Sequence, residues 1–139
     1  MIEQYFDFKK VVEYCREYGE SRITERSMEE IGKGKATVFA KIVDGIIVGF
    51  TALFNDNGVN VTVVIPEHRK KGYGTELLRH KIEYVEKQGL KFQTRIGAIN
   101  IPSIKVALKC GLTLVGVEKI DTGCGVALIF EHKKEVRHD

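Results

Sequence analysis

Apolar residues recur with the spacing of an amphipathic helix in three segments of the chain. Residues 7–18 and 75–89 place apolar side chains three or four positions apart, and residues 23–31 predict a shorter helix that ends at Gly32. Asp7 precedes the first helix as its predicted N-cap. The predicted apolar stripes consist of Phe8, Val11, Val12, Cys15 and Tyr18 in the first helix and of Leu78, Ile82 and Val85 in the long one.

Short runs of alternating or β-branched residues predict the strands. Residues 36–43 and 46–55 flank Asp44-Gly45, a pair that favours a two-residue hairpin turn. The remaining predicted strands cover residues 59–65, 91–99, 113–119 and 125–131, with tight turns at 56–58 and 121–123. Because a predicted helix crosses between the strands at 59–65 and 91–99, these two strands are expected to lie parallel.

The order of these elements predicts an α/β fold in a single domain over residues 1–139. The expected sheet is mixed, twisted and mostly antiparallel, with the parallel pair at its centre and helices flanking it. A first strand within residues 1–6 is expected to be short or missing.

A basic, glycine-rich turn joins the strand at 59–65 to the long helix. Its sequence is Arg69-Lys70-Lys71-Gly72-Tyr73-Gly74. Glycine lets the backbone approach a ligand closely, and the start of a helix directs N–H groups and a positive dipole end at an anion. The turn fits neither a Walker loop, which needs G-x-x-x-x-G-K-[ST], nor a dinucleotide fingerprint, which needs a third glycine at Leu77. We therefore expect a phosphate-binding turn of another kind.

Two ordered motifs make the chain resemble the Gcn5-related N-acetyltransferase (GNAT) family. Residues 64–74 match V-x-P followed by R/Q-x-x-G-x-G/A, and residues 100–112 match N-x-x-[AS], a short helix and K-x-G-F, with Leu112 in place of the aromatic residue. The resemblance covers about residues 37–130. It implies the GNAT-like acyl-CoA N-acyltransferase fold, acetyl-CoA as the acyl donor, and direct transfer of the acetyl group to a primary amine of a small molecule or of a protein or peptide.

The resemblance also implies where acetyl-CoA binds. Backbone N–H groups of residues 70–75 would hold the pyrophosphate, and exposed backbone of the strand before the turn would pair with the two amides of the pantetheine arm. The expected cofactor-binding residues are Thr62, Val63, Val64, Arg69, Lys70, Lys71, Gly72, Tyr73, Gly74, Thr75, Asn100 and Ser103. Asn100 also fits the N-cap of the following helix, and both roles can coexist. No metal site is expected, because no pair of histidines has zinc-ligand spacing.

The acid and base that relatives use have no counterpart at the matching positions. Ala107 stands where many relatives have a tyrosine, and Arg95 where some have a glutamate. Positioning alone, with ordered water near Asn60 or Thr62, is one alternative. Groups at unmatched positions are another: Tyr5, Tyr14, Tyr18 and Tyr84 as acids, and Asp56 or Glu131 as bases. No catalytic residue is assigned, and a non-catalytic acyl-CoA-binding or sensing module stays open as an alternative function.

The composition indicates which kinds of partner the protein binds and in which cellular compartment it is expected. Apolar residues make up 43% and charged residues 29%, as in globular domains, and the net charge of +3 is too small to indicate nucleic acid, although it suits an acidic acceptor. The most apolar stretch, residues 45–54, is too short to span a bilayer. Three widely spaced cysteines suit a reducing cytoplasm. We expect a cytoplasmic enzyme whose partners are acetyl-CoA and an amine, with a homodimer as a quaternary state that the resemblance implies.

Overall fold

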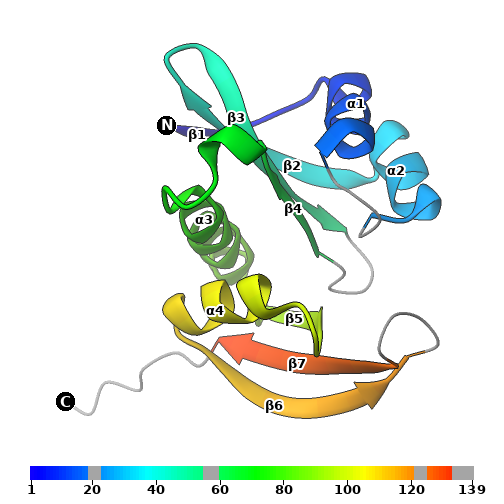
Figure 1. Ribbon diagram of the computed structural model, residues 1–139, viewed down its shortest axis with the longest axis vertical. Helices are drawn as coiled ribbons and strands as arrows, with labels where there is room; N and C mark the ends of the chain where they lie inside the picture. Colours follow the sequence, from blue (N-terminus) through cyan, green and yellow to red (C-terminus); the bar gives the residue numbers. More distant parts are fainter. Residues whose placement is uncertain (19–22, 55–59, 121–124, 133–139) are drawn as a thin grey trace. The chain divides into compact units, whose positions relative to one another are not determined.

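The computed structural model describes residues 1–18, 23–54, 60–120 and 125–132 (Figure 1). It divides into two units, Met1–Lys81 and Ile82–Asp139. Helix α3 (Tyr73–Lys87) contributes its first turns to one unit and its last turns to the other. The turns predicted at 56–58 and 121–123 lie outside the described residues.

The first unit contains a four-stranded antiparallel sheet. Its order is β1-β2-β3-β4, formed by Ile2–Gln4, Ala36–Val43, Ile46–Phe54 and Asn60–Val64. The predicted hairpin is confirmed, because Asp44 (φ 51°) and Gly45 (φ 77°) both adopt the left-handed backbone of a two-residue turn. The first strand is present: β1 is three residues long and pairs with β2.

Helices α1 (Phe8–Tyr18) and α2 (Glu25–Gly32) cover one face of this sheet (Figure 1). The predicted cap of α1 is confirmed, since the N–H of Lys10 donates to Asp7 Oδ1 at 3.2 Å. The core on this face is continuous across both helices and three strands. It includes Val11, Cys15, Met28, Ile31, Val38, Ala40, Phe50, Ala52, Val61 and Val63. Because side chains alternate along a strand, the residues between these point to the opposite face, where α3 packs.

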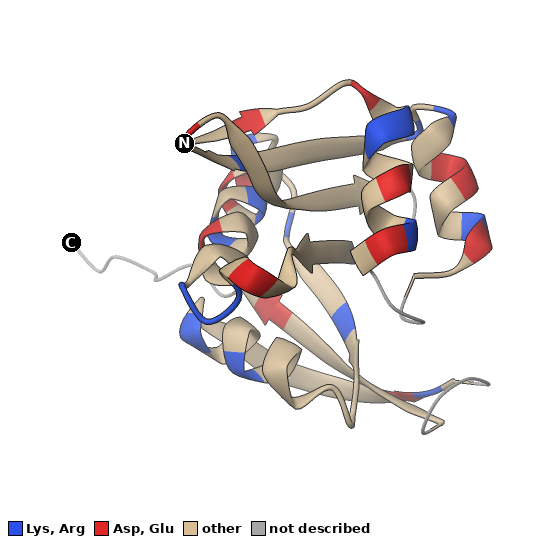
Figure 2. Ribbon diagram, turned by 45° about the horizontal axis from the view of Figure 1, so that its top comes forward, with Lys and Arg blue, Asp and Glu red and all other residues tan. Residues whose placement is uncertain are grey.

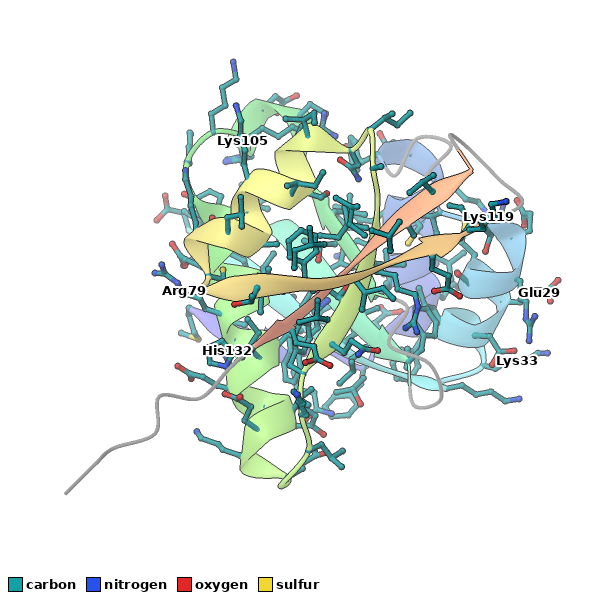
Figure 3. All side chains as sticks on the ribbon, turned by 90° about the horizontal axis from the view of Figure 1, so that it is seen from below. Glu29, Lys33, Arg79, Lys105, Lys119 and His132 are labelled. Atoms are coloured by element: carbon teal, nitrogen blue, oxygen red, sulfur yellow. The ribbon has the colours of Figure 1, made fainter. Side chains whose placement is uncertain are left out.

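The second unit contains a three-stranded antiparallel sheet and helix α4 (Ile101–Lys109). The sheet order is β5-β7-β6, formed by Gln93–Gly97, Val126–His132 and Leu112–Lys119. His132, labelled in Figure 3 at the end of β7, contacts Glu86 of α3 through Nδ1 and Oε2 at 2.8 Å. This contact and the backbone bond from His132 N–H to Phe92 O (3.2 Å) join β7 to the segment that precedes β5.

The structure corrects two details of the sequence-based fold. Helix α3 begins at Tyr73 instead of residue 75. Of its predicted apolar stripe, Ile82 and Val85 are buried but Leu78 is only half-buried, and Leu77 and Lys81 are buried as well. The strands form two hydrogen-bonded sheets instead of one continuous mixed sheet, because every described ladder is antiparallel and none joins β4 to β5. The parallel course of β4 and β5 stays a prediction.

The described residues contain no helix long and apolar enough to cross a membrane. Nor does this part of the chain gather three or more His, Cys, Asp or Glu side chains in a metal-binding arrangement.

Candidate functional site

The turn between β4 and α3 has the backbone conformation that its glycines predict. A short 3-10 helix, Pro66–His68, follows β4, and the chain then passes through two left-handed residues, Lys70 (φ 64°) and Gly72 (φ 82°). A Cβ atom at Gly72 would meet nothing within 4 Å, so conformation and not crowding is the reason for glycine there. The backbone at this point faces open space, as a ligand-binding turn requires.

The first turn of α3 presents N–H donors at the end of this loop. The first intrahelical bond runs from the N–H of Glu76 to the carbonyl of Gly72 at 3.0 Å. The N–H groups of Tyr73 and Gly74 precede it, and no described residue accepts a hydrogen bond from them. Figure 2 shows the loop as a basic segment, since Arg69, Lys70 and Lys71 stand in a row before the helix. Backbone donors, the helix dipole and these cations together favour an anion such as a pyrophosphate.

Three contacts hold the loop and the helix start against the sheet. Arg69 donates from Nε to the carbonyl of Val64 at 3.1 Å, which ties the loop back to the end of β4. Lys41 of β2 forms an ion pair with Glu76, with Nζ and Oε2 2.7 Å apart, and its Nζ lies 5.5 Å from the centroid of the Tyr73 ring. Because Glu76 accepts this hydrogen bond, the pKa of Lys41 is raised. The predicted phosphate turn is therefore positioned by specific contacts.

The outer edge of β4 directs backbone N–H and C=O groups away from β3. Ile65 N–H donates to Val48 O at 2.9 Å, so the hydrogen-bonded pairs of the ladder are Val48 with Ile65 and, two residues on, Phe50 with Val63. Thr62 and Val64 belong to the alternate pairs and direct their N–H and C=O groups away from β3. The prediction for Val63 is corrected accordingly, because strand alternation turns its backbone groups inward to Phe50.

Asn100 and Ser103 lie together at the start of α4 in the second unit. The N–H of Ser103 donates to Asn100 Oδ1 at 3.4 Å, so Asn100 is the N-cap of α4, as one of its two predicted roles required. Pro102 occupies the first turn, where a missing N–H costs little. Both side chains are half-buried.

The positions that usually carry the acid and the base hold no free ionisable group. Ala107 is fully buried, and Arg95 donates from Nε to Glu118 Oε2 at 2.6 Å. Glu131 bonds Gln93 (2.9 Å) and Lys91 (2.8 Å).

The tyrosines proposed as acids in the first unit serve packing. Tyr5, Tyr14 and Tyr18 pack against the core cluster, and Tyr14 contacts Phe50 edge-on with ring centroids 6.2 Å apart. Cys15 is inert, since burial raises the pKa of its thiol to about 11. Asp56 lies outside the described residues.

A buried lysine on α3 is the polar group that sequence reasoning missed. Lys81 is fully buried, and its Nζ lies 2.7 Å from Thr51 Oγ1 of β3, which in turn lies 2.8 Å from Thr62 Oγ1 of β4. Burial lowers the pKa of the Lys81 ammonium to about 7. The signal in the sequence was its spacing, because Lys81 lies four residues from both Leu77 and Val85 in an apolar row.

A hollow of about 440 Å³ lies between α1 and α2. Its lining residues are Lys9, Val12, Glu13, Arg16, Met28, Glu29 and Gly32. None of them belongs to β4, to the phosphate turn or to α3, so this hollow carries no argument about the chemistry.

Comparison with known proteins decides the family. The model of the acetyltransferase (GNAT) family matches residues 9–112. The chain belongs to this family. It is 33% identical over 64 residues to the N-acetyltransferase 9-like protein of Schizosaccharomyces pombe, a match that covers 41% of this chain and 30% of that protein. This GNAT chain thus matches less than a third of the length of that curated relative.

Solved structures show the same fold. The ribosomal-protein-S18-alanine N-acetyltransferase from Escherichia coli superposes with a TM-score of 0.74 at 18% identity, covering 95% of this chain and 92% of that one. A GNAT family acetyltransferase from Elizabethkingia anophelis with acetyl-CoA bound superposes with a TM-score of 0.76 at 12% identity, covering 96% and 97%. The expected acyl-CoA N-acyltransferase fold is confirmed.

Proposed function

We propose that this GNAT protein is an acetyl-CoA-dependent N-acetyltransferase that moves an acetyl group directly to a primary amine of a small molecule or of a protein or peptide. One observation carries the proposal: a left-handed Gly72 and the uncapped N–H groups of Tyr73 and Gly74 follow directly on a strand with a free backbone edge. The turn at Gly72 and the N–H groups that follow it suit a pyrophosphate, and the strand edge suits the amides of a pantetheine arm.

The residues divide between the parts of acetyl-CoA. The pyrophosphate takes the N–H groups of residues 70–75 and the charges of Lys70 and Lys71, whereas Arg69 holds the loop to Val64 O. Thr62 offers its outward backbone groups to the pantetheine amides, and Asn100 and Ser103 are the residues of the second motif assigned to the same arm. The C=O of Val64 already accepts from Arg69 Nε, so Val64 contributes its N–H. Val63 contributes only by keeping β4 paired to β3.

The reaction asks for three things from the protein. An acceptor ammonium must lose a proton, the thioester oxygen must be stabilised as charge develops on it, and the leaving thiolate must gain a proton. Acetyl-CoA supplies the activated acyl group. The outward N–H of Val64 on β4 is a donor suited to the thioester oxygen.

The remaining features of the proposal follow from composition and family resemblance. We place the enzyme in the cytoplasm as a single functional domain over residues 1–139, with no nucleic-acid or membrane partner. Family resemblance alone adds a homodimer as a candidate quaternary state. The family model supports one domain, because residues 9–112 include parts of both structural units.

Calorimetric titration with acetyl-CoA, CoA and dephospho-CoA tests the cofactor site. We expect micromolar binding of acetyl-CoA that Gly72→Asp abolishes, since an aspartate adds both backbone strain and negative charge to the phosphate turn. Gly89→Asp is the matched control: Gly89 also has a positive φ (77°) and open space at its Cβ, but it follows the opposite end of α3. Equal loss in both variants, or no binding by the wild type, would contradict the site.

A non-catalytic acyl-CoA-binding or sensing module is the second candidate. Ala107 and Arg95 favour it, since neither can act as the usual acid or base. Release of CoA on incubation with acetyl-CoA and an amine panel separates the two, because only an enzyme turns over.

A further inference from the structure

Three polar side chains form a continuous hydrogen-bonded row beneath the free edge of β4. Lys81 Nζ, Thr51 Oγ1 and Thr62 Oγ1 are joined by contacts of 2.7 Å and 2.8 Å, and Thr51 Oγ1 also lies 3.1 Å from Val61 O. Lys81 and Thr51 are fully buried, whereas Thr62 is half-buried. The row therefore runs from the interior to the strand whose backbone edge is offered to the cofactor.

The surroundings of Lys81 favour its neutral form. An ammonium carries three N–H donors, yet Thr51 is the only hydrogen-bond acceptor that the described residues give to Nζ. Strands β3 and β4 carry no charged residue. Of the ionisable groups on neighbouring elements, Lys41 of β2 is paired with Glu76, and His80 of α3 packs against Phe39 with ring centroids 4.6 Å apart. Tyr84 lies one turn further along α3.

We propose that Lys81 is the proton acceptor for the acetyl-transfer reaction and acts through Thr51 and Thr62. This inference rests on the proposed acetyltransferase function. It assigns a base where the matching positions of the two motifs have none, and it uses residues from three elements of one unit.

The proton movement balances without any further reagent. In the structure the Thr51 hydroxyl donates to Val61 O and accepts from Lys81 Nζ, so the relay requires it to turn toward the lone pair of the neutral Lys81 amine. One N–H bond of the acceptor ammonium then breaks as its proton passes to Thr62 Oγ1, while the hydroxyl proton of Thr62 passes to Thr51 and that of Thr51 to Lys81 Nζ. Each hydroxyl breaks one O–H bond and forms another, and Lys81 changes from amine to ammonium. The amine keeps the released electron pair for attack on the thioester carbon. After the attack the nitrogen carries two protons, and a second N–H bond breaks as one of them passes to the leaving thiolate while the C–S bond breaks. Lys81 returns its own proton along the same row to solvent, so each turnover releases one proton.

Direct titration of Lys81 tests, independently of activity, whether the side chain loses its proton near neutral pH. In protein labelled with ¹³C and ¹⁵N in its lysines, the Lys81 signal is identified by its loss in Lys81→Met. We expect it to titrate near neutrality, far below the range of the other lysines. A midpoint above about pH 9 would overturn the proposal, because the lysine would then hold its proton at neutral pH.

Kinetics test whether Lys81 and Thr51 take part in the reaction. The panel of acceptors consists of a primary alkylamine, a diamine, an Nα-blocked lysine and a peptide with a free N-terminus. Lys81→Met and Thr51→Val are expected to bind acetyl-CoA within about twofold of wild type and to lose about 10²–10⁴-fold in kcat. The rise of wild-type kcat with pH should share the midpoint of the Lys81 titration and disappear in both variants. Thr37→Val on β2 is the matched control and should keep wild-type kinetics.

The outcomes separate this inference from the function on which it rests. Wild-type kcat and an unchanged pH profile in Lys81→Met and Thr51→Val would overturn the relay and leave the acetyltransferase intact. Binding of acetyl-CoA by the wild type without turnover on any acceptor would contradict the acetyltransferase, and the relay with it. Two variants at different points of the row keep the test valid if one of them fails to fold.

Discussion

At the scale of single residues, burial decides the properties of Lys81. Its four-carbon stem fills the apolar row between Leu77 and Val85, and its amine reaches the hydroxyl of Thr51. Taking an ammonium out of water costs free energy unless a partner compensates, and a neutral hydroxyl compensates only in part. The folded protein is therefore less stable when Lys81 is protonated than when Lys81 is neutral.

Stability measured against pH should report this burial. Between the pKa of about 7 in the folded state and about 10.4 in the unfolded state, unfolding takes up a proton. The free energy of unfolding of the wild type relative to Lys81→Met should therefore rise by about 1.4 kcal/mol per pH unit from about pH 7 upward. Urea denaturation of both proteins at pH 6, 7, 8 and 9 measures the difference, and a difference independent of pH would contradict the prediction.

The two glycines of the phosphate turn should respond differently to alanine. Gly72 has φ 82°, where a Cβ costs about 1–2 kcal/mol, so Gly72→Ala should destabilise the protein and weaken acetyl-CoA binding about tenfold or more. Gly74 is helical, and its Cβ would lie 4.0 Å from Val64 Cγ2, an ordinary contact. Gly74→Ala should keep the binding and gain up to about 1 kcal/mol of stability. Calorimetry and urea denaturation of the pair would show both effects, and equal behaviour would argue against them.

At the scale of elements, helix starts carry the chemistry that the sequence motifs predict. The N-terminus of α3 presents donors at the phosphate turn, and the N-terminus of α4 is capped by Asn100. Local sequence was sufficient to predict the start of α4 and gave that of α3 two residues late, because glycine, asparagine and proline act on the backbone within a few residues. The buried face of α3 was less predictable, since only contact with β3 turns Lys81 inward.

Two substitutions at Asn100 distinguish its structural role from its cofactor role. Asn100→Ala removes the cap and should cost about 1 kcal/mol in the free energy of unfolding. Asn100→Asp keeps an oxygen for the N–H of Ser103 but loses the amide donor. It should retain wild-type stability and bind acetyl-CoA more weakly. Wild-type affinity in Asn100→Asp would restrict the residue to capping α4.

At the scale of the whole molecule, the chain forms two units, each with its own sheet, whereas a single family model matches residues from both units. The two units divide after Lys81, inside α3, whereas the match to the GNAT model continues to residue 112. Sequence motifs on both sides of this division are assigned to the same ligand. Ligand binding should therefore be visible in the stability of the chain as a whole.

Acetyl-CoA should stabilise the protein against unfolding. A ligand that binds only the folded state at a hundred times its Kd adds about 2.7 kcal/mol. Thermal unfolding followed by circular dichroism should show a rise in Tm that increases with acetyl-CoA concentration, a smaller rise with dephospho-CoA, and none in Gly72→Asp. A ligand-dependent rise in Gly72→Asp equal to that of the wild type would place the binding elsewhere.

The sequence alone determined the elements, the hairpin at Asp44-Gly45, the left-handed turn at Gly72 and the cap of α4, because each depends on backbone preferences within a few neighbouring residues. Strand pairing and register arise between distant segments, so only the tertiary structure showed that Val63 faces β3 while Thr62 and Val64 face outward. The row from Lys81 through Thr51 to Thr62 joins residues up to 30 positions apart. Its chemistry exists only because packing removes water from a lysine that the chain alone would leave solvated.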